Sequence, residues 1–188
     1  MNHVLLLSGP PGAGKSAVAA AICERYDRML LVEVDELRQW VKAGYRHPWA
    51  EDALAAEQRL LALRNACAIA REAVALRYAV VIADPMLAEQ VPWYRELLEG
   101  IGCEVHFVLL LPTLAAALAR DAGRGADSIP ERVRALHAQL SAEAASGRFP
   151  GVVLDTTQDA NAQLTADRLQ DAVATGVSLF VSAPARGG

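Results

Sequence analysis

Short apolar runs alternate with longer stretches of helical periodicity along most of the chain. The apolar runs, each of strand length, cover residues 3–7, 29–34, 79–83, 105–111 and 152–154. In the longest intervening stretch, residues 51–77, apolar side chains such as Leu60, Leu63 and Cys67 recur every three or four positions and form one stripe of a helix. This alternation is typical of a parallel sheet covered by helices. We therefore predict an α/β fold with a five-stranded parallel sheet.

The other stretches with helical periodicity are shorter and are separated by segments rich in Gly, Pro and Asp. They predict helices over residues 15–26, 36–43, 93–99, 114–120, 130–145 and 163–174. An irregular segment at 44–49 and a loop at 121–128 interrupt this pattern. Since 188 residues is the length of one domain, we predict a single domain over residues 1–181, with a small lid at about 120–130 and a frayed tail at 182–188.

The composition fits a folded protein and argues against several kinds of partner. Hydrophobic residues make up 53% of the chain and charged residues 21%, which provides a core and excludes extensive disorder. With 18 basic and 22 acidic residues the net charge is -4, so nucleic acid could bind only in a local basic groove. The apolar runs are too short to span a bilayer, and the first residues lack the pattern of a signal peptide. We expect a cytoplasmic protein with no membrane partner.

The first apolar run is followed by the sequence GPPGAGKS at residues 9–16, which matches the phosphate-loop pattern GxxxxGK[ST]. Glycines allow the backbone to turn so tightly that several amides point at one phosphate group. Lys15 would neutralise oxygens between the β and γ phosphates, and the Ser16 hydroxyl would hold Mg²⁺. An ordinary turn before a helix is the alternative, but one of only two lysines falls on the lysine position of the motif. The predicted ATP-binding residues here are Gly9, Pro10, Pro11, Gly12, Ala13, Gly14, Lys15, Ser16 and Ala17.

A carboxylate, Asp35, follows the second predicted strand 20 residues after Lys15. Ligands of doubly wound sheets gather at the carboxyl ends of the strands, so Asp35 is expected to face the same crevice as the phosphate loop. There it could accept the proton of an attacking hydroxyl and orient the oxygen toward the γ phosphate. Arg38 is three residues further on, on the same helical face, and could bind the acceptor. The alternatives are a helix cap for Asp35 and a solvated surface side chain for Arg38.

Aromatic residues make up only 5% of the chain, yet several of them crowd the irregular segment after Arg38. We predict that Tyr45, Arg46 and Trp49 form the wall of an acceptor pocket through stacking and hydrogen bonds. Packing of the same side chains as anchors of the loop is an equally good interpretation. The segment therefore suggests a pocket for an acceptor but does not identify the acceptor.

A second carboxylate, Asp84, ends the apolar run at 79–83. A carboxylate in this place suits a Mg²⁺ ligand, through water or together with Ser16. Capping of the following helix is the alternative. We therefore predict Ser16 and Asp84 as the metal-binding residues.

Two arginines, Arg120 and Arg124, are four positions apart at the end of a predicted helix and share one face of it. A polar, glycine-bearing loop follows them, as expected of a lid that closes over bound nucleotide. In such a lid, arginines stabilise the charge of the phosphoryl group during transfer; solvated arginines are the alternative. Thr156 and Thr157 follow the last predicted strand, where they could contact the nucleotide base or simply end the strand.

Together these motifs resemble one family, the P-loop kinase group that includes polynucleotide 5'-hydroxyl kinases, chloramphenicol phosphotransferases and zeta toxins. The resemblance rests on four short segments in the same order: GPPGAGKS at 9–16, DELR at 35–38, Asp84, and RDAGRG at 120–125 followed by Ile129-Pro130. It implies a three-layer P-loop NTPase fold with a small helical lid. It also implies ATP and Mg²⁺ at Lys15 and Ser16, a general base at Asp35, and lid arginines at 124 and 120.

The chain departs from the closest of these patterns in two places. Polynucleotide kinases have an arginine before the acidic residues, whereas this chain has Val34 there. The segment at 44–49 also matches no member of the group. We therefore predict an ATP-dependent kinase that phosphorylates a hydroxyl of a small molecule such as an antibiotic, a sugar or a nucleotide-sugar. A polynucleotide 5'-hydroxyl kinase and a non-catalytic nucleotide-binding regulatory protein remain the alternatives.

Overall fold

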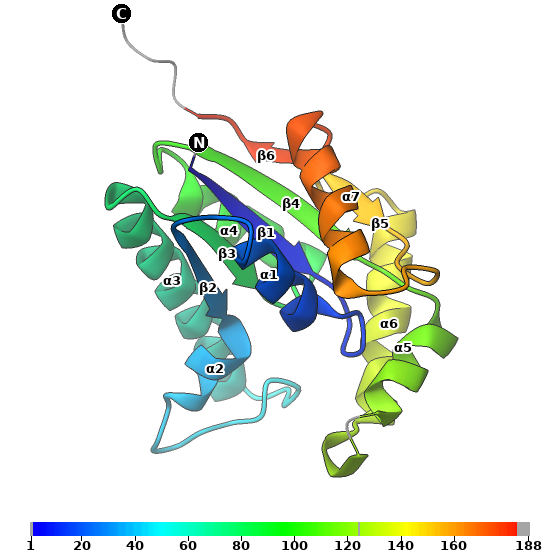
Figure 1. Cartoon of the computed structure of the whole chain (residues 1–188). Coiled ribbons are helices and arrows are strands. Elements are labelled where there is room, and N and C mark those ends of the chain that lie inside the picture. The colour runs from blue at the N-terminus through cyan, green and yellow to red at the C-terminus, as the bar shows by residue number, and fades with distance from the viewer. Residues whose placement is uncertain (1, 124, 184–188) are drawn as a thin grey trace, which may run out of the picture.

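The computed structural model of the protein describes residues 2–123 and 125–183. A twisted sheet runs through the molecule, with its strands in the order β2-β3-β1-β4-β5 and with a further strand, β6, paired to β4 (Figure 1). The strands are β1 (His3–Ser8), β2 (Met29–Glu33), β3 (Ala79–Ala83), β4 (Glu104–Leu110), β5 (Val152–Leu154) and β6 (Leu179–Val181). The five-stranded parallel sheet predicted from the sequence is thus confirmed.

The sixth strand is an addition that the apolar pattern did not predict. β6 is only three residues long and pairs antiparallel with the start of β4, through a register irregularity at Val105/His106. Two of its three side chains are not fully buried. A run this short, with little apolar burial, carries almost no periodic signal. The described part of the predicted tail is therefore confined to residues 182–183, and the rest of it, 184–188, lies outside the described residues.

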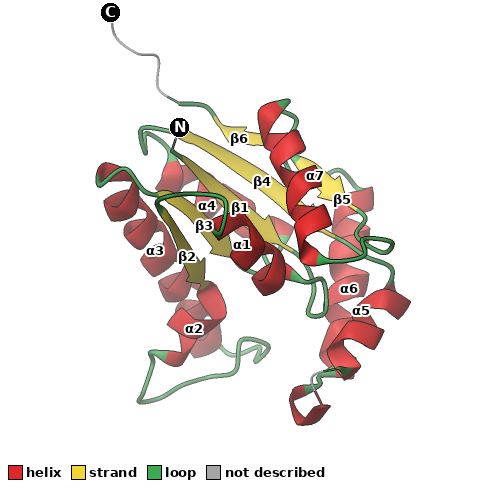
Figure 2. Ribbon diagram, viewed as in Figure 1, coloured by secondary structure: helices red, strands yellow, loops and turns green. Residues whose placement is uncertain are grey.

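Helices cover both faces of the sheet and complete a three-layer fold (Figure 2). On one face, α1 (Lys15–Cys23) and α7 (Ala162–Ala174) pack against alternate side chains of the central strands. On the other, a larger core joins the sheet to α3 (Ala53–Ala75), α4 (Val91–Leu98) and α6 (Pro130–Ala145). The central strands are buried on both faces, which explains why they read as continuous apolar runs rather than as alternating ones. The predicted P-loop NTPase fold is confirmed.

Two short helices stand at the carboxyl ends of the strands, where the site lies. They are α2 (Val34–Gln39) and α5 (Leu114–Ala122). Single turns of 3-10 helix, η1 (Ala88–Gln90) and η2 (Gly125–Asp127), follow β3 and α5. Among the residues that the structure describes, no helix is both long and apolar enough to cross a membrane.

Most predicted boundaries lie within a few residues of the observed ones, and one difference concerns the site. The helix expected at 36–43 begins at Val34, immediately after β2. Asp35 therefore lies in the first turn of α2 instead of at the strand end itself. A carboxylate in the first turn of a helix interacts favourably with the helix dipole.

Candidate active site

The loop between β1 and α1 has the backbone shape of a phosphate cradle. Gly12 and Gly14 have φ angles of 78° and 93°, a region that side chains other than glycine rarely adopt. A Cβ atom at Gly12 would lie 2.2 Å from the carbonyl oxygen of Ala117, so the loop packs directly against α5. Gly14 faces open space. No side chain of the described residues caps the start of α1 at Gly14, so the first amides of this helix are not taken up by a capping side chain, as phosphate binding there requires.

Lys15 reaches back across this loop. Its Nζ donates hydrogen bonds to the carbonyl oxygens of Gly9, at 2.7 Å, and Pro10, at 3.2 Å. Ser16 and Ala17 are exposed on the first turn of α1. The side chains that the sequence assigns to triphosphate and Mg²⁺ thus come together at one helix N-terminus.

A chain of hydrogen bonds leads from the protein interior to Asp35. Tyr94, fully buried on α4, donates its hydroxyl proton to Asp84 Oδ2 at 2.9 Å. Arg38 donates from Nη2 to Asp84 Oδ1 at 2.8 Å and from Nη1 to Asp35 Oδ1. The Asp35 side chain is 61% exposed, whereas that of Arg38 is 8% exposed. Arg38 therefore links a buried carboxylate to an accessible one.

The charge states in this chain follow from burial and from the neighbouring charges. Burial alone lowers the pKa of Arg38, but the carboxylates of Asp84 and Asp35 outweigh it and the pKa of this guanidinium is raised. Burial, followed by the negative charge of Asp84, raises the pKa of Tyr94 well above its usual value. Tyr94 therefore remains a hydrogen-bond donor at neutral pH, and Arg38 remains a cation.

These contacts give Asp84 a partner set that sequence reasoning did not anticipate. Its side chain is 1% exposed, and each carboxylate oxygen already accepts one hydrogen bond. Ser16 and Asp84, both described, share no hydrogen bond. Ser16 is exposed, whereas Asp84 is bonded to Arg38 and Tyr94 inside the protein. Its binding to Mg²⁺ therefore stays a prediction.

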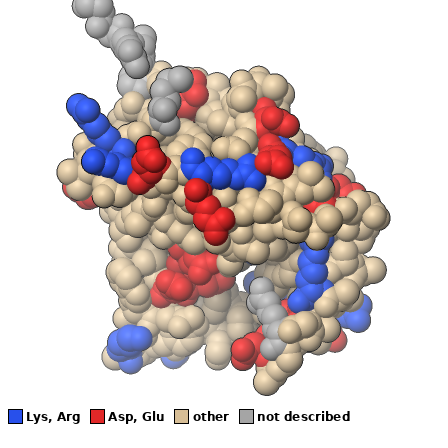
Figure 3. All heavy atoms as spheres, in the orientation of Figure 1, with Lys and Arg blue, Asp and Glu red and all other residues tan. Residues whose placement is uncertain are grey.

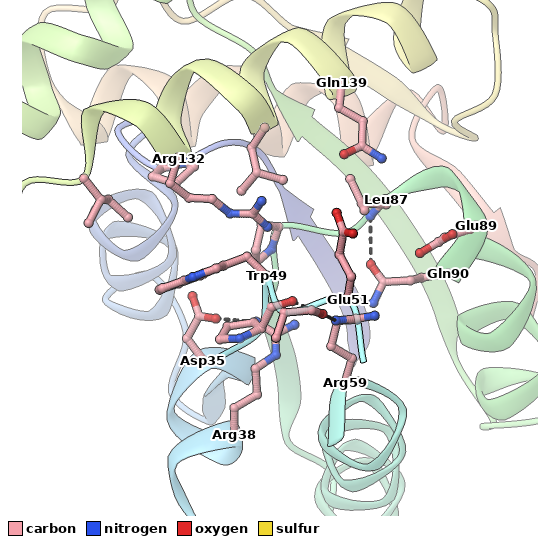
Figure 4. A pocket seen from close by; sticks show the side chains of 16 residues that line it. Asp35, Arg38, Trp49, Glu51, Arg59, Leu87, Glu89, Gln90, Arg132 and Gln139 are labelled. Atoms are coloured by element: carbon pink, nitrogen blue, oxygen red, sulfur yellow. Dashed lines mark hydrogen bonds and ion pairs between the residues drawn. The ribbon is translucent and has the colours of Figure 1, made fainter. Parts of the chain in front are cut away.

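A cavity of about 470 Å³ connects the phosphate loop to Asp35 (Figure 4). Its lining includes Pro11, Asp35, Arg38, Trp49, Arg59 and Arg132. These residues come from the phosphate loop, α2, the segment before α3, α3 and α6. The cavity thus places the predicted base beside the predicted nucleotide site and leaves room for a second, small substrate.

The aromatic segment at 44–49 contributes one wall of this cavity. Trp49, 50% exposed, stacks on His47 with ring centroids 4.7 Å apart. Tyr45 packs edge-on against His47 and does not line the cavity. Arg46 does not line it either, because its backbone N–H donates to Gln58 Oε1 at 2.8 Å and anchors the segment to α3. Of the three predicted acceptor residues in this segment, the structure brings only Trp49 to the cavity.

Two arginines that the sequence analysis did not single out also face this space. Arg59, on α3, donates from Nη1 to the carbonyl oxygens of Pro48 and Ala50, at 2.9 and 3.0 Å, and so fixes the loop that carries Trp49. The Arg132 guanidinium, on α6, lies 5.8 Å from the centre of the Trp49 ring. The only sequence signal for a functional role of Arg132 is its position just after Ile129-Pro130, which belongs to the lid motif. No sequence signal points to Arg59.

Thr156 and Thr157, predicted to meet the nucleotide base, are hydrogen-bonded to α5 and to its N-cap residue Thr113. Arg120 donates to the carbonyl oxygen of Thr156 at 2.7 Å, and Thr157 Oγ1 accepts from the backbone N–H of Thr113 at 2.8 Å. Arg120 therefore contacts the end of β5, on the α5 side of the phosphate loop. Arg124 lies outside the described residues, so a shared anion site with Arg120 stays a prediction.

The predicted lid begins at a buried carboxylate. Asp121 Oδ2 accepts hydrogen bonds from Ser128 Oγ, at 2.7 Å, and from the backbone N–H of Ile129, at 2.8 Å. These bonds join the end of α5 to the start of α6 across η2. The segment is thus a closed turn tied at its base, and its movement over bound nucleotide stays a prediction.

Known proteins similar to this chain share its fold. A family model described as an AAA domain matches residues 4–150. The tunicamycin resistance protein of Deinococcus radiodurans is 22% identical, with a TM-score of 0.64 over 98% of this chain and 100% of that chain. A sugar kinase from Janibacter sp. HTCC2649 is 21% identical, with a TM-score of 0.65 over 95% of this chain and 98% of that one. A chain of the Pnkp1/Rnl/Hen1 RNA repair complex is 16% identical, with a TM-score of 0.60 over 77% of this chain and 46% of that one.

Proposed function

The chain belongs to the AAA domain family and has a P-loop kinase-like fold, and on this premise we propose that it transfers the γ phosphate of ATP to a hydroxyl group of a small molecule. One observation carries the proposal: a single cavity is lined both by Pro11 of the phosphate loop and by Asp35. Phosphoryl transfer needs the two substrates in line, with little covalent participation by the protein. A cavity lined by residues of both predicted sites supports such an arrangement.

The nucleotide end of the site is built to hold a triphosphate. The amides of the phosphate loop and the start of α1 would bind the phosphate oxygens, and the Lys15 ammonium would exchange its carbonyl partners for them. The exposed Ser16 hydroxyl would hold Mg²⁺. When bound, the metal ion neutralises charge on the phosphates as it builds up during transfer. Arg120, Thr156 and Thr157 would lie toward the nucleotide base.

The acceptor end supplies a base. The acceptor hydroxyl would donate its hydrogen bond to Asp35 Oδ2, which accepts none from the residues that the structure describes. As the proton passes to Asp35, the oxygen bonds to the γ phosphorus and the bond from that phosphorus to the β–γ bridging oxygen breaks, which leaves ADP. Arg38, held by Asp84, would keep the Asp35 carboxylate directed at the cavity.

The shape and charge of the site favour a small acceptor. The cavity is bounded by Trp49 and is of the size that encloses a small ligand. On the face shown in Figure 3, Lys and Arg side chains form separate patches interleaved with acidic ones rather than one continuous band. A strand of nucleic acid would need such a band along its backbone. The sugar kinase and the tunicamycin resistance protein of like fold support the same choice by their names.

The direct test is transfer from Mg²⁺-ATP to a panel of sugars, sugar acids, nucleotide-sugars and antibiotics, read by mass spectrometry. Wild-type protein should give a phosphorylated product and ADP in equal amounts. Asp35→Asn should lose transfer and keep ATP binding, whereas Glu36→Gln, an exposed neighbour on α2, should behave as wild type. ATP binding without a product from any compound would contradict the proposal and support a nucleotide-binding regulatory protein.

A second candidate function is a polynucleotide 5'-hydroxyl kinase. The contact between Asp35 and Arg38 favours it, as does the fold match to a chain of an RNA repair complex. Adding a single-stranded oligonucleotide with a 5' hydroxyl to the panel separates the two. Phosphorylation of the oligonucleotide and of no small compound would replace the first proposal by the second.

A further inference from the structure

We propose that the acceptor is a polyhydroxylated anion, whose carboxylate or phosphate group binds Arg132 and Arg59 while one of its hydroxyls faces Asp35. The inference rests on the proposed kinase function, because it concerns the acceptor half of the same cavity. It names the substrate class and assigns two cavity residues that the sequence motifs do not point to. Four observations support it.

The first observation is that Arg132 forms no hydrogen bond or ion pair with any residue in 2–123 or 125–183. Its guanidinium lies over the Trp49 ring, 5.8 Å from the ring centre. It is partly buried on α6 and lines the cavity. Burial lowers the pKa of Arg132 and the positive charges of Arg38 and Arg59 lower it further, whereas the negative charge of Asp35 partly opposes them. An anion bound here would relieve both effects.

The second observation is that the cations of the cavity are unequally neutralised. Arg38 is paired with Asp35 and Asp84. Arg59 bonds only to the neutral carbonyl oxygens of Pro48 and Ala50, and only through Nη1. The positive charge of Arg59 is therefore offset by no partner in the part of the chain described. Arginine pairs bind carboxylate and phosphate groups in two-pronged fashion, which makes an anionic group the matching ligand.

The third observation concerns the acidic residues of the same cavity. Glu51 and Glu89 line it, are exposed, and form no ion pair with a described residue. Figure 4 shows Glu89 and Gln139 at the end of the cavity away from Asp35. The Glu89 carboxylate there would repel a compact anion but would accept hydrogen bonds from hydroxyl groups. A ligand with several hydroxyls and one anionic group satisfies both ends.

The fourth observation is the position of Trp49 between Asp35 and Arg132 (Figure 4). Its indole already packs on His47 on one side. Arg132 faces the same ring from 5.8 Å. A ligand packed against the half-exposed indole would therefore lie in the cavity that Asp35 and Arg132 both line.

The test compares two pairs of compounds, each with one anionic and one neutral member: gluconate with gluconamide, and glucose 6-phosphate with glucose. Each is titrated by calorimetry into the whole protein saturated with ADP and Mg²⁺, so that the phosphate loop is already filled. We expect at least one charged member to bind about tenfold or more tightly than its neutral partner. The pair with the larger preference shows whether the anionic group is a carboxylate or a phosphate.

Variants locate the preference. Arg132→Gln should abolish it, and Arg132→Lys, which keeps the charge, should retain part of it. Arg134→Gln is the matched control, because Arg134 is exposed on the same helix and does not line the cavity. Unchanged thermal unfolding of Arg132→Gln would show that the loss is local.

Several outcomes would overturn the inference. They are equal binding of charged and neutral members, no binding of either pair, a preference that survives in Arg132→Gln, or tighter binding of a single-stranded oligonucleotide than of every small anion. The proposed kinase function is judged separately in the same experiment by the affinity for ADP and by transfer from ATP. Phosphorylation of neutral sugars, with no charge preference, would leave the function standing and remove only the anionic acceptor.

Discussion

The phosphate loop and the acceptor cavity share one crevice but are built in opposite ways. The loop is eight consecutive residues whose backbone amides would bind the phosphates. At Gly12 it packs so closely against α5 that no side chain would fit. The cavity is lined by side chains from separate segments, and Trp49 in its wall is half exposed. The first is fixed by local backbone geometry, the second by packing across the fold. Almost any substitution in the phosphate loop should therefore disturb nucleotide binding. Substitutions in the acceptor cavity should be tolerated and should change the affinity for the acceptor by small factors.

The largest effect is expected from Lys15→Ala. Loss of the ammonium removes charge stabilisation that no neighbouring side chain replaces, so kcat/KM for ATP should fall by about 10³-fold or more. Steady-state kinetics with the best acceptor measures this. Lys42→Ala, at the only other lysine, which is exposed, should leave the rate unchanged. A wild-type rate in Lys15→Ala would remove Lys15 from the site.

Glycine substitutions compare the two halves directly. In Gly12→Ala the new methyl group would meet the Ala117 carbonyl oxygen at 2.2 Å, so ADP affinity should fall about 100-fold as the loop is forced open. Gly44 also has a positive φ, 71°, but open space around it. Gly44→Ala should cost about 1–2 kcal/mol of folding free energy and leave ADP binding intact. Equal effects on ADP binding, measured by calorimetry, would contradict the contrast.

A third change tests the buried support of Asp35. Tyr94→Phe removes the donor to Asp84 Oδ2 and leaves a buried carboxylate oxygen without a partner, which should cost about 1–3 kcal/mol of unfolding free energy in urea. Arg38 should then hold Asp35 less firmly, so kcat should fall while ADP affinity stays the same. A fall in ADP affinity without a change in kcat would show that the chain of bonds does not act on Asp35.

The pH dependence of stability follows from the same group. Because the folded-state pKa of Tyr94 is raised above its unfolded value, the folded protein holds this proton more tightly. Its contribution is complete below about pH 10, the unfolded pKa, and is lost as the pH rises through the higher folded value. The pKa of the Cys67 thiol is raised to about 12, mainly by burial, so Cys67 also contributes stability that is lost in alkali. This loss begins at a lower pH than for Tyr94, because an unfolded thiol has a lower pKa than a tyrosine. Urea titrations should show that wild type loses stability in alkali more steeply than Tyr94→Phe.

The smallest effect is expected at the cavity wall. Trp49→Ala should raise KM for the acceptor about tenfold, since aromatic contacts of this kind contribute about 0.5–1.5 kcal/mol beyond the area they bury. KM for ATP should not change. Trp40→Ala is the control, because Trp40 is 64% exposed and does not line the cavity. A shift in KM for ATP instead would place Trp49 in the nucleotide half.

The same contrast explains how much the sequence could predict. The strands and helices are encoded by the periodicity of apolar residues, and the phosphate loop by one contiguous motif. Each could therefore be located from a short stretch of sequence. The contact of Asp35 with Arg38 follows from their spacing on one helical turn. The strand β6 escaped prediction because three residues, of which only Phe180 is buried, carry too little pattern.

Contacts between distant segments had no such signal. Arg38 pairs with Asp84 across 46 residues, and no spacing rule relates them. In the sequence, Arg59 and Arg132 are ordinary polar positions of amphipathic helices. Only the folded structure brings them to the cavity that Asp35 lines. The cluster of aromatic residues at 44–49 predicted both Tyr45 and Trp49 for the pocket wall. Only tertiary packing decides which of the two lines the cavity. Side chains gathered by tertiary structure are thus invisible to local patterns.

The central claim is that the phosphate loop directs the terminal phosphate of ATP into the cavity that holds Asp35. It is tested most directly by a crystal structure of the wild-type protein with Mg²⁺ and a non-hydrolysable ATP analogue. We predict a terminal phosphate in the space between Pro11 and Asp35, close enough that an acceptor oxygen bonded to Asp35 lies about 3–3.5 Å from the phosphorus. A terminal phosphate on the far side of the loop, with protein between it and Asp35, would contradict the account.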